Sequence, residues 1–265
     1  LFHTGKMASG FFDIPQNFGI QGLFLDKDIS LQVPLDQSDF FFELGHINEA
    51  ERWASEALSL YGESSAVLKR LALVNILQDE PRATLPYLNR LRKNPLSRSW
   101  ANHYLSSLTN PALLRNETLL QKLHAYRPKQ DFIVATSYPE IDLEKMLSQS
   151  PANRMAFEYL MTACLLNRDL DGFIKNLIQF RAFTKTQLPR HYEEALIAYL
   201  AVNKSSADTA ASQIKIRTST IQRFADFERI LSEHGSNNIA AYPELSQKHG
   251  DTFWFYLLYP TGVAK

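Results

Sequence analysis

Few residues in this sequence have the types and spacing that chemistry at a protein site requires. Glu43-Leu-Gly-His46 can place a carboxylate and an imidazole on one helical face. A di-iron bundle needs two such motifs and two further carboxylates, and the sequence contains only this one. Cys164 lies in an apolar pattern of helical period, which predicts a buried core thiol rather than a nucleophile. We therefore expect no metal, no cofactor and no catalytic residue.

Two further groups of acidic residues have a simpler interpretation. Glu140 and Asp142, and the glutamates of His191-Tyr-Glu-Glu194, fall at the starts of expected helices, where carboxylates favour the positive end of the helix dipole. The sequence also lacks Gly-x-Ser-x-Gly and any phosphate-binding loop. These observations favour a protein that is not an enzyme. A helical-barrel hydrolase or carbohydrate-binding protein is the alternative, because its carboxylates can be distant in sequence.

Composition excludes several classes of protein. The chain has 265 residues, of which 45% are hydrophobic and 21% charged, so it is long and apolar enough to bury a core. Twenty-eight basic and twenty-eight acidic residues leave no net charge, which argues against a nucleic-acid partner. The single cysteine excludes an internal disulfide and any zinc site built on paired cysteines.

Charge is nevertheless uneven along the chain. Residues 34–64 contain seven acids and one base, whereas residues 90–130 contain eight bases and one acid. This asymmetry has two interpretations: a bipolar surface that orients a partner or approaches anionic head groups, or solvated helix faces that merely differ in composition.

The periodicity predicts an all-α protein. From Pro34 onward, apolar residues recur every three or four positions, and the only short strand candidate is 132–135. Possible N-cap residues are Asn48, Asp79, Asn153 and Asp169, and Pro189 can open a helix. The expected helices are 34–45, 48–61, 65–77, 80–93, 97–108, 116–126, 141–149, 153–166, 169–182, 189–203, 208–233 and 251–258.

Internal repeats refine this expectation. Ala50 is followed by small residues on one helical face, Ala83 lies 33 residues later, and Pro95 ends the unit. This spacing resembles that of tetratricopeptide repeats, helix pairs that stack into a superhelix, over residues 34–108. A second internal repeat, with a spacing of 35 residues, relates residues 157–165 to residues 192–200.

The resemblance to tetratricopeptide repeats implies a groove that binds a peptide or protein. The groove residues that it implies are Lys69 and Asn75 on one first helix and Asn102 on the next. Such side chains can clamp a peptide backbone or carboxylate. The expected organisation is an irregular apolar arm (1–33), tetratricopeptide-like helix pairs (34–108), an irregular connecting segment (109–152) and a second helical-repeat section packed on the first (153–265).

A second resemblance covers nearly the whole chain. The opening Leu-Phe-His-Thr-Gly-Lys-Met and the segments 153–161, 166–171, 188–195 and 253–256 resemble an uncharacterised bacterial family of Bacteroides-type species. That family has a membrane-spanning N-terminal half and a helical-repeat C-terminal half. The resemblance implies a soluble, periplasmic part of a cell-envelope protein, attached to the membrane only through segments that this chain lacks. It implies no activity.

Overall fold

The computed structural model describes residues 33–132, 134, 139–184, 188–203, 211, 213–235 and 237–259. Every element within these residues is a helix, which confirms the all-α helical-repeat fold class. The expected arm over 1–33 lies outside the described residues except for Val33, and so do two of the four residues of the strand candidate. No described helix is long and apolar enough to cross a bilayer.

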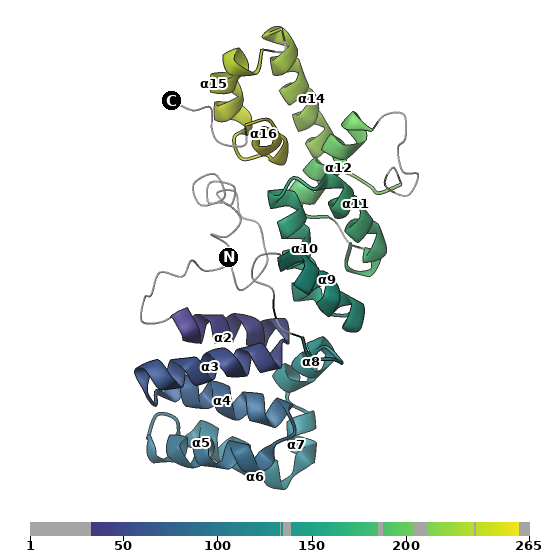
Figure 1. Cartoon of the computed structure of the whole chain (residues 1–265). Coiled ribbons are helices and arrows are strands. Elements are labelled where there is room, and N and C mark those ends of the chain that lie inside the picture. The colour runs from purple at the N-terminus through teal and green to yellow at the C-terminus, as the bar shows by residue number, and fades with distance from the viewer. Residues whose placement is uncertain are drawn as a thin grey trace. The chain divides into compact units, whose positions relative to one another are not determined.

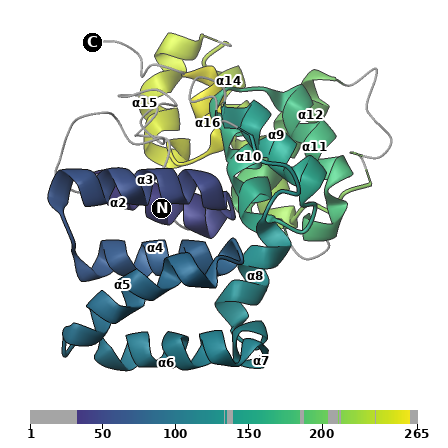
Figure 2. The same ribbon diagram turned by 60° about the horizontal axis from the view of Figure 1, so that its bottom comes forward.

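The chain forms two compact units that divide after Phe157. The first unit, shown in Figure 1 from purple to teal, contains the helices up to the start of α10. Its helices are α2 (Val33–Leu44), α3 (Ile47–Tyr61), α4 (Ser65–Leu77), α5 (Pro81–Lys93), α6 (Arg98–Thr109), α7 (Pro111–Arg115), α8 (Thr118–Tyr126) and α9 (Pro139–Gln149). Consecutive helices from α2 to α8 pack on one another, as Figure 2 shows for the antiparallel layers α2 to α6.

Small buried residues allow these helices to approach closely. Ala50, Ala54 and Ala57 of α3 are fully buried. Thirty-four residues later, on α5, the equivalent positions are Thr84, Leu88 and Leu91, which are also buried. The expected equivalence of Ala50 with Ala83 was therefore wrong by one residue. Successive residues of a helix point about 100° apart, so Ala83 turns partly away from the core while Thr84 faces it.

The expected irregular segment 109–152 contains helices α7, α8 and α9, so it is irregular only in part. Two of its prolines, Pro111 and Pro139, each begin a helix. A proline is well accommodated at this position because the missing N–H has no partner within the helix.

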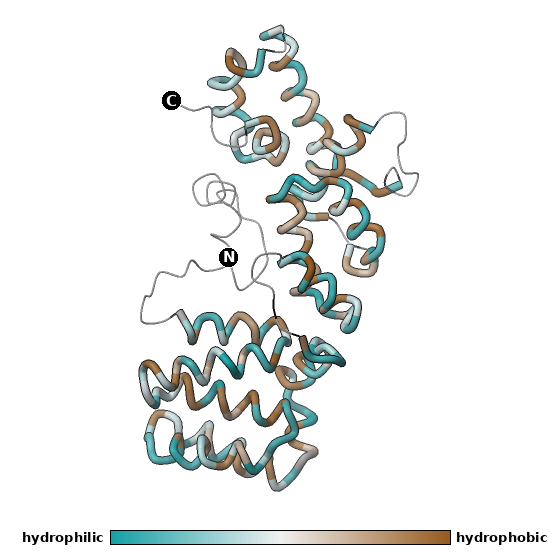
Figure 3. The backbone as a smooth tube through the Cα atoms, in the orientation of Figure 1, coloured by the Kyte–Doolittle hydropathy of each residue, from teal (hydrophilic) through white to brown (hydrophobic). Residues whose placement is uncertain are grey.

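The second unit contains the rest of α10 and the helices that follow it. Its elements are α10 (Arg154–Leu166), α11 (Leu170–Gln179), the short 3₁₀ helix η3 (Arg181–Thr184), α12 (Arg190–Val202), α14 (Thr218–Glu233), α15 (Asn238–His249) and α16 (Phe253–Leu258). Figure 3 shows that apolar and polar stretches alternate along the described helices, as expected for helices that bury one face. The aromatic run at 253–256 is buried throughout.

The caps agree with the sequence at two of four positions. Asn153 accepts a hydrogen bond from the Ala156 amide (3.0 Å), and Asp169 accepts one from the Gly172 amide (2.8 Å). Asn48 lies inside α3, and Asp79 precedes the cap of α5 with a φ of 61°. A short polar side chain is one of the few that tolerates that left-handed conformation.

Candidate functional site

The first unit brings two of the three expected groove residues to neighbouring helices. Lys69 lies on α4, half-buried, and Asn102 lies on α6, exposed. Lys69 contacts α6 through Trp100, whose ring centroid lies 5.5 Å from the Lys69 Nζ; Asn102, two residues later on α6, points to a different side of that helix. A cation over an indole face is attracted by the ring quadrupole, so Lys69 is held against α6.

Asn75 differs from the other two residues because its side chain is buried. Its Nδ2 donates a hydrogen bond to the Leu71 carbonyl (2.7 Å) on the same helix. Asn75 lies among the core residues of α4, and this position does not support the expectation that it contacts a ligand.

The surface around Trp100 is aromatic and polar. Its ring lies 4.5 Å from the ring of Tyr104, which is buried behind it. The neighbouring His103 Nε2 lies 2.6 Å from a Glu117 carboxylate oxygen. Burial, with the Glu117 charge as a second cause, raises the pKa of Tyr104 above its usual value, so its hydroxyl stays protonated at neutral pH. We name Lys69, Trp100 and Asn102 the α4–α6 surface; Lys69 and the half-buried Trp100 are in contact, and the exposed Asn102 continues the surface around another side of α6.

An ion pair joins α2 to α4, which are the first helices of two successive helix pairs. The Arg70 Nε on α4 donates a hydrogen bond to the Asp39 carboxylate on α2 (3.0 Å), and the guanidinium lies over the Phe42 ring at 3.7 Å. Desolvation lowers the pKa of Arg70 below its usual value, although Asp39 opposes that shift. An apolar residue is usual in tetratricopeptide repeats where Arg70 falls, and here the guanidinium packs on an aromatic ring instead.

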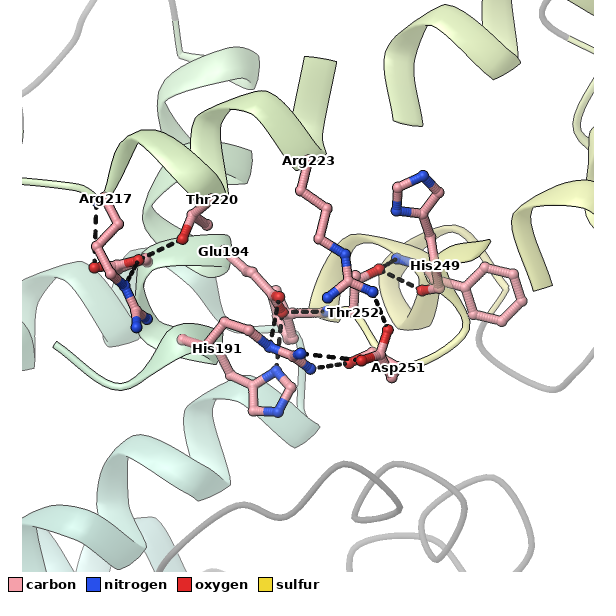
Figure 4. A network of polar contacts seen from close by, with 12 residues as sticks. His191, Glu194, Arg217, Thr220, Arg223, His249, Asp251 and Thr252 are labelled. Atoms are coloured by element: carbon pink, nitrogen blue, oxygen red, sulfur yellow. Dashed lines mark hydrogen bonds and ion pairs between the residues drawn. The ribbon is translucent and has the colours of Figure 1, made fainter. Parts of the chain in front are cut away.

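The second unit contains a denser polar network, drawn in Figure 4. It begins with two adjacent glutamates of α12 that are 1% and 0% exposed, so each needs a partner to remain charged. Glu193 accepts hydrogen bonds from the Arg217 Nε (2.8 Å) and the Thr220 hydroxyl (2.6 Å), both at the start of α14. Glu193 therefore fixes the beginning of α14 on α12.

Glu194 reaches a different element. Its Oε2 accepts hydrogen bonds from the Phe253 amide (2.8 Å) at the start of α16 and contacts the His191 Nδ1 at 2.9 Å. The Arg190 Nε lies 3.1 Å from the Glu194 Oε1, without hydrogen-bond alignment. Glu194 therefore holds the first turn of α16.

Asp251 completes the network in the turn before α16. It pairs with Arg190 of α12 (3.0 Å) and with Arg223 of α14 (Figure 4). Desolvation is the largest influence on the pKa of Asp251 and raises it, but the two guanidinium groups together hold it below its usual value. Asp251 therefore stays ionised near neutral pH and links three helices.

The carboxylates of Glu193, Glu194 and Asp251 each bind groups on other helices. Glu193 and Glu194 are neighbours in sequence, but their partners come from different helices, α14 and α16.

The remaining residues that the sequence suggested for chemistry are Cys164, His46 and possible metal ligands. Cys164 is buried, as predicted. His46 is 1% exposed and stacks edge-on to Phe132 at 4.6 Å, and neither ring nitrogen has a partner among the described residues. Within the described part of the chain, no group of three or more His, Cys, Asp or Glu is placed to hold a metal ion.

Sequence reasoning missed Trp100 and the role of Glu193 and Glu194. Trp100 lies two residues before Asn102 on α6 and points to a different side of that helix, so its contact with Lys69 was not indicated by the expected groove residues. The glutamates were assigned to the dipole of α12, and Glu193 does lie in its first turn. Their main partners come from α14 and α16, and no local pattern indicates them.

Comparisons with known proteins assign a family and no activity. No curated protein and no solved structure matches the chain. The model of a family of unknown function, DUF6057, matches residues 1–260. This match agrees with the expectation of an uncharacterised family, while the Bacteroides-type origin and the membrane-spanning half are expectations that it leaves open. The chain belongs to the DUF6057 family.

Proposed function

We propose that this protein is a non-catalytic helical-repeat scaffold, and that the α4–α6 surface binds an extended segment of a protein partner. The observation that carries the proposal is Trp100, a large aromatic side chain that stays partly exposed beside the Lys69 cation. Aromatic residues with adjacent polar groups are typical anchors at protein interfaces.

Each residue of the surface has a definite part in this proposal. The Trp100 indole offers apolar area for a side chain of the partner. Asn102 can donate to and accept from a peptide backbone, and Lys69 can pair with a carboxylate. Because Lys69 is already held near Trp100, little side-chain entropy is lost when a ligand binds.

The alternative of a helical-barrel hydrolase or carbohydrate-binding protein finds less support. The buried carboxylates of the second unit are bound by Arg217, Thr220 and the Phe253 amide, so they are not free to act on a substrate. We therefore propose a binding role rather than an enzymatic one.

Site-specific photo-crosslinking tests this function. A benzophenone amino acid replaces Asn102 in cells that make the natural protein, and the matched control replaces Asn89, an exposed asparagine of α5. We expect a covalent adduct to one protein from position 102 and none from position 89. The proposal fails if position 102 gives no adduct, or if both positions capture the same proteins.

We also propose that the protein works in a bacterial cell envelope, on the periplasmic side. The support is the sequence resemblance to a family with a membrane-spanning half. Cell fractionation with an antibody against this chain tests the location, and recovery in the cytosol alone would contradict it.

A further inference from the structure

Two neighbouring turns form one edge of the first unit, away from α7 and α8. The α3–α4 turn and the α5–α6 turn lie at the same end of the helix layers in both views (Figures 1 and 2). The Arg90 guanidinium on α5 pairs with Glu63 in the first of these turns. The Asn94 Nδ2 also donates a hydrogen bond to the Ser65 hydroxyl (3.0 Å), which ties the second turn to α4. The two turns therefore form one surface.

Three large apolar side chains of this edge point into solvent. Leu60 is 58% exposed, Tyr61 36% and Leu96 94%. Leu96 has almost no contact with the protein around it, although its backbone is fixed by a hydrogen bond from its amide to the Asn94 Oδ1 (3.0 Å). An ordered turn thus presents a leucine outward.

Basic residues flank Leu96 in the sequence. Arg92, Lys93 and Arg98 are all exposed, and residues 90–98 contain no acid. In the neighbouring α3–α4 turn, the acid Glu63 is already paired with Arg90. We name this surface, consisting of Leu60, Tyr61, Arg92, Lys93, Leu96 and Arg98, the basic edge.

Helix stability explains only part of the basic edge. Arg92 and Lys93 lie in the last turn of α5, where cations favour the negative end of the helix dipole. That effect requires no exposed leucine three residues later, and exposure of Leu96 loses the free energy that burial would provide.

We propose that the basic edge docks on a bilayer surface rich in anionic lipids, with Leu96 inserted among the acyl chains. The cations contact lipid phosphates, Tyr61 lies at head-group depth, and Leu96 enters the hydrocarbon boundary. This inference is independent of the proposed function, because the α4–α6 surface contributes no residue to the basic edge. It revises the expectation that the membrane is reached only through segments outside this chain.

The shape of the edge favours lipid over a protein partner. A leucine that protrudes from a turn needs a complementary pocket on a folded protein, whereas a fluid bilayer accommodates it without one. The uniform positive charge between 90 and 98 matches a layer of phosphates.

Vesicle co-sedimentation of the full chain tests the proposal. The probes are vesicles of phosphatidylcholine with roughly 30% phosphatidylglycerol and vesicles of phosphatidylcholine alone. We expect binding to the anionic vesicles that weakens as salt is added, and little binding to the neutral ones.

Two variants separate the contributions. Combined Arg92→Gln, Lys93→Gln and Arg98→Gln removes three charges, each of which contributes about fivefold to binding, so the combination weakens it roughly a hundredfold. Leu96→Ser weakens it about tenfold. The matched control is Ile239→Ser, which replaces an apolar side chain that is 74% exposed in the second unit, and it leaves binding unchanged.

Insertion is read directly from a fluorophore. The chain has one cysteine, so Leu96→Cys with Cys164→Ala carries an environment-sensitive dye at position 96 alone. Its emission shifts to the blue on anionic vesicles and is quenched by lipids that carry quenchers in their tails. The proposal is overturned if the dye does not respond, if Leu96→Ser binds as tightly as the parent, or if a soluble acidic polypeptide shifts the dye as the vesicles do, which would indicate a protein partner.

Discussion

Glu194→Ala is the substitution that most sharply tests the network of the second unit. The carboxylate is 0% exposed, and its Oε2 accepts the Phe253 amide and contacts the His191 ring. Truncation removes the acceptor of the buried Phe253 amide, the contact with the His191 ring and the ionic contact with Arg190, which keeps Asp251 as a partner. Breaking a buried ionic contact by removing one partner costs about 3–5 kcal/mol. That loss is a large fraction of the total stability of an ordinary domain.

Urea denaturation and hydrogen exchange together measure the effect. We expect Glu194→Ala to lower the free energy of unfolding of the second unit by about 3–5 kcal/mol and to speed amide exchange first in α16. The matched control is Glu228→Ala on α14, an exposed glutamate whose loss should stay within about 0.5 kcal/mol. A cost below about 1 kcal/mol for Glu194→Ala, or equal effects of the two variants, would refute the assignment of Glu194 as an anchor of α16.

Three further predictions concern packing, pH and thiol reactivity. Ala50→Leu should cost about 1–3 kcal/mol by overpacking, and Ala83→Leu clearly less, because Ala83 is partly exposed; urea midpoints that rank the two variants the other way would contradict the 34-residue register. Burial lowers the pKa of His46 below its usual value, against the opposing charges of Glu49 and Asp131. The unfolded chain therefore takes up this proton at a higher pH than the folded protein does, and the free energy of unfolding decreases as pH drops below about 6.5. His46→Leu should therefore lose less stability than the parent between pH of about 7.5 and 5.5 in parallel denaturation curves, and equal losses would show that His46 is not responsible. A thiol reagent should label Cys164 slowly in the native protein and quickly in denaturant, whereas rapid native labelling would reveal a reactive thiol.

Helices with a strong apolar period were predictable from the sequence. The helix over 65–77 has the expected bounds, because the Ser64 hydroxyl caps its first turn and a continuous apolar run follows. Local signals of this kind need no knowledge of the rest of the chain.

Helix α15 was not among the expected helices, and Pro243 lies inside it. Pro243 is exposed and removes only the single backbone bond that its N–H would have made. Asn237 compensates by accepting hydrogen bonds from two first-turn amides, those of Ile239 and Ala240. The stabilisation of α15 by the Asn237 cap was not apparent from the composition of the segment.

The start of α14 depends on a tertiary contact that the sequence does not indicate. The expected helix began at residue 208, but α14 begins at Thr218, immediately after Arg217. Arg217 donates to the buried Glu193 from another helix, and this contact fixes where the helix starts. The candidate site shows the same limit: Lys69 and Asn102 were implied by the resemblance to tetratricopeptide repeats, whereas the contact of Lys69 with Trp100 required two helices to be placed together.

The affinity of the partner segment for a Trp100 variant tests the binding role most directly. The segment captured at position 102 is synthesised as a peptide and titrated calorimetrically into the parent, Trp100→Ala and Trp53→Ala. Truncation of an aromatic anchor should weaken binding by at least about tenfold, with no change for Trp53, which lies on α3. Equal affinity of the parent and Trp100→Ala for the peptide would contradict the proposed role of the α4–α6 surface.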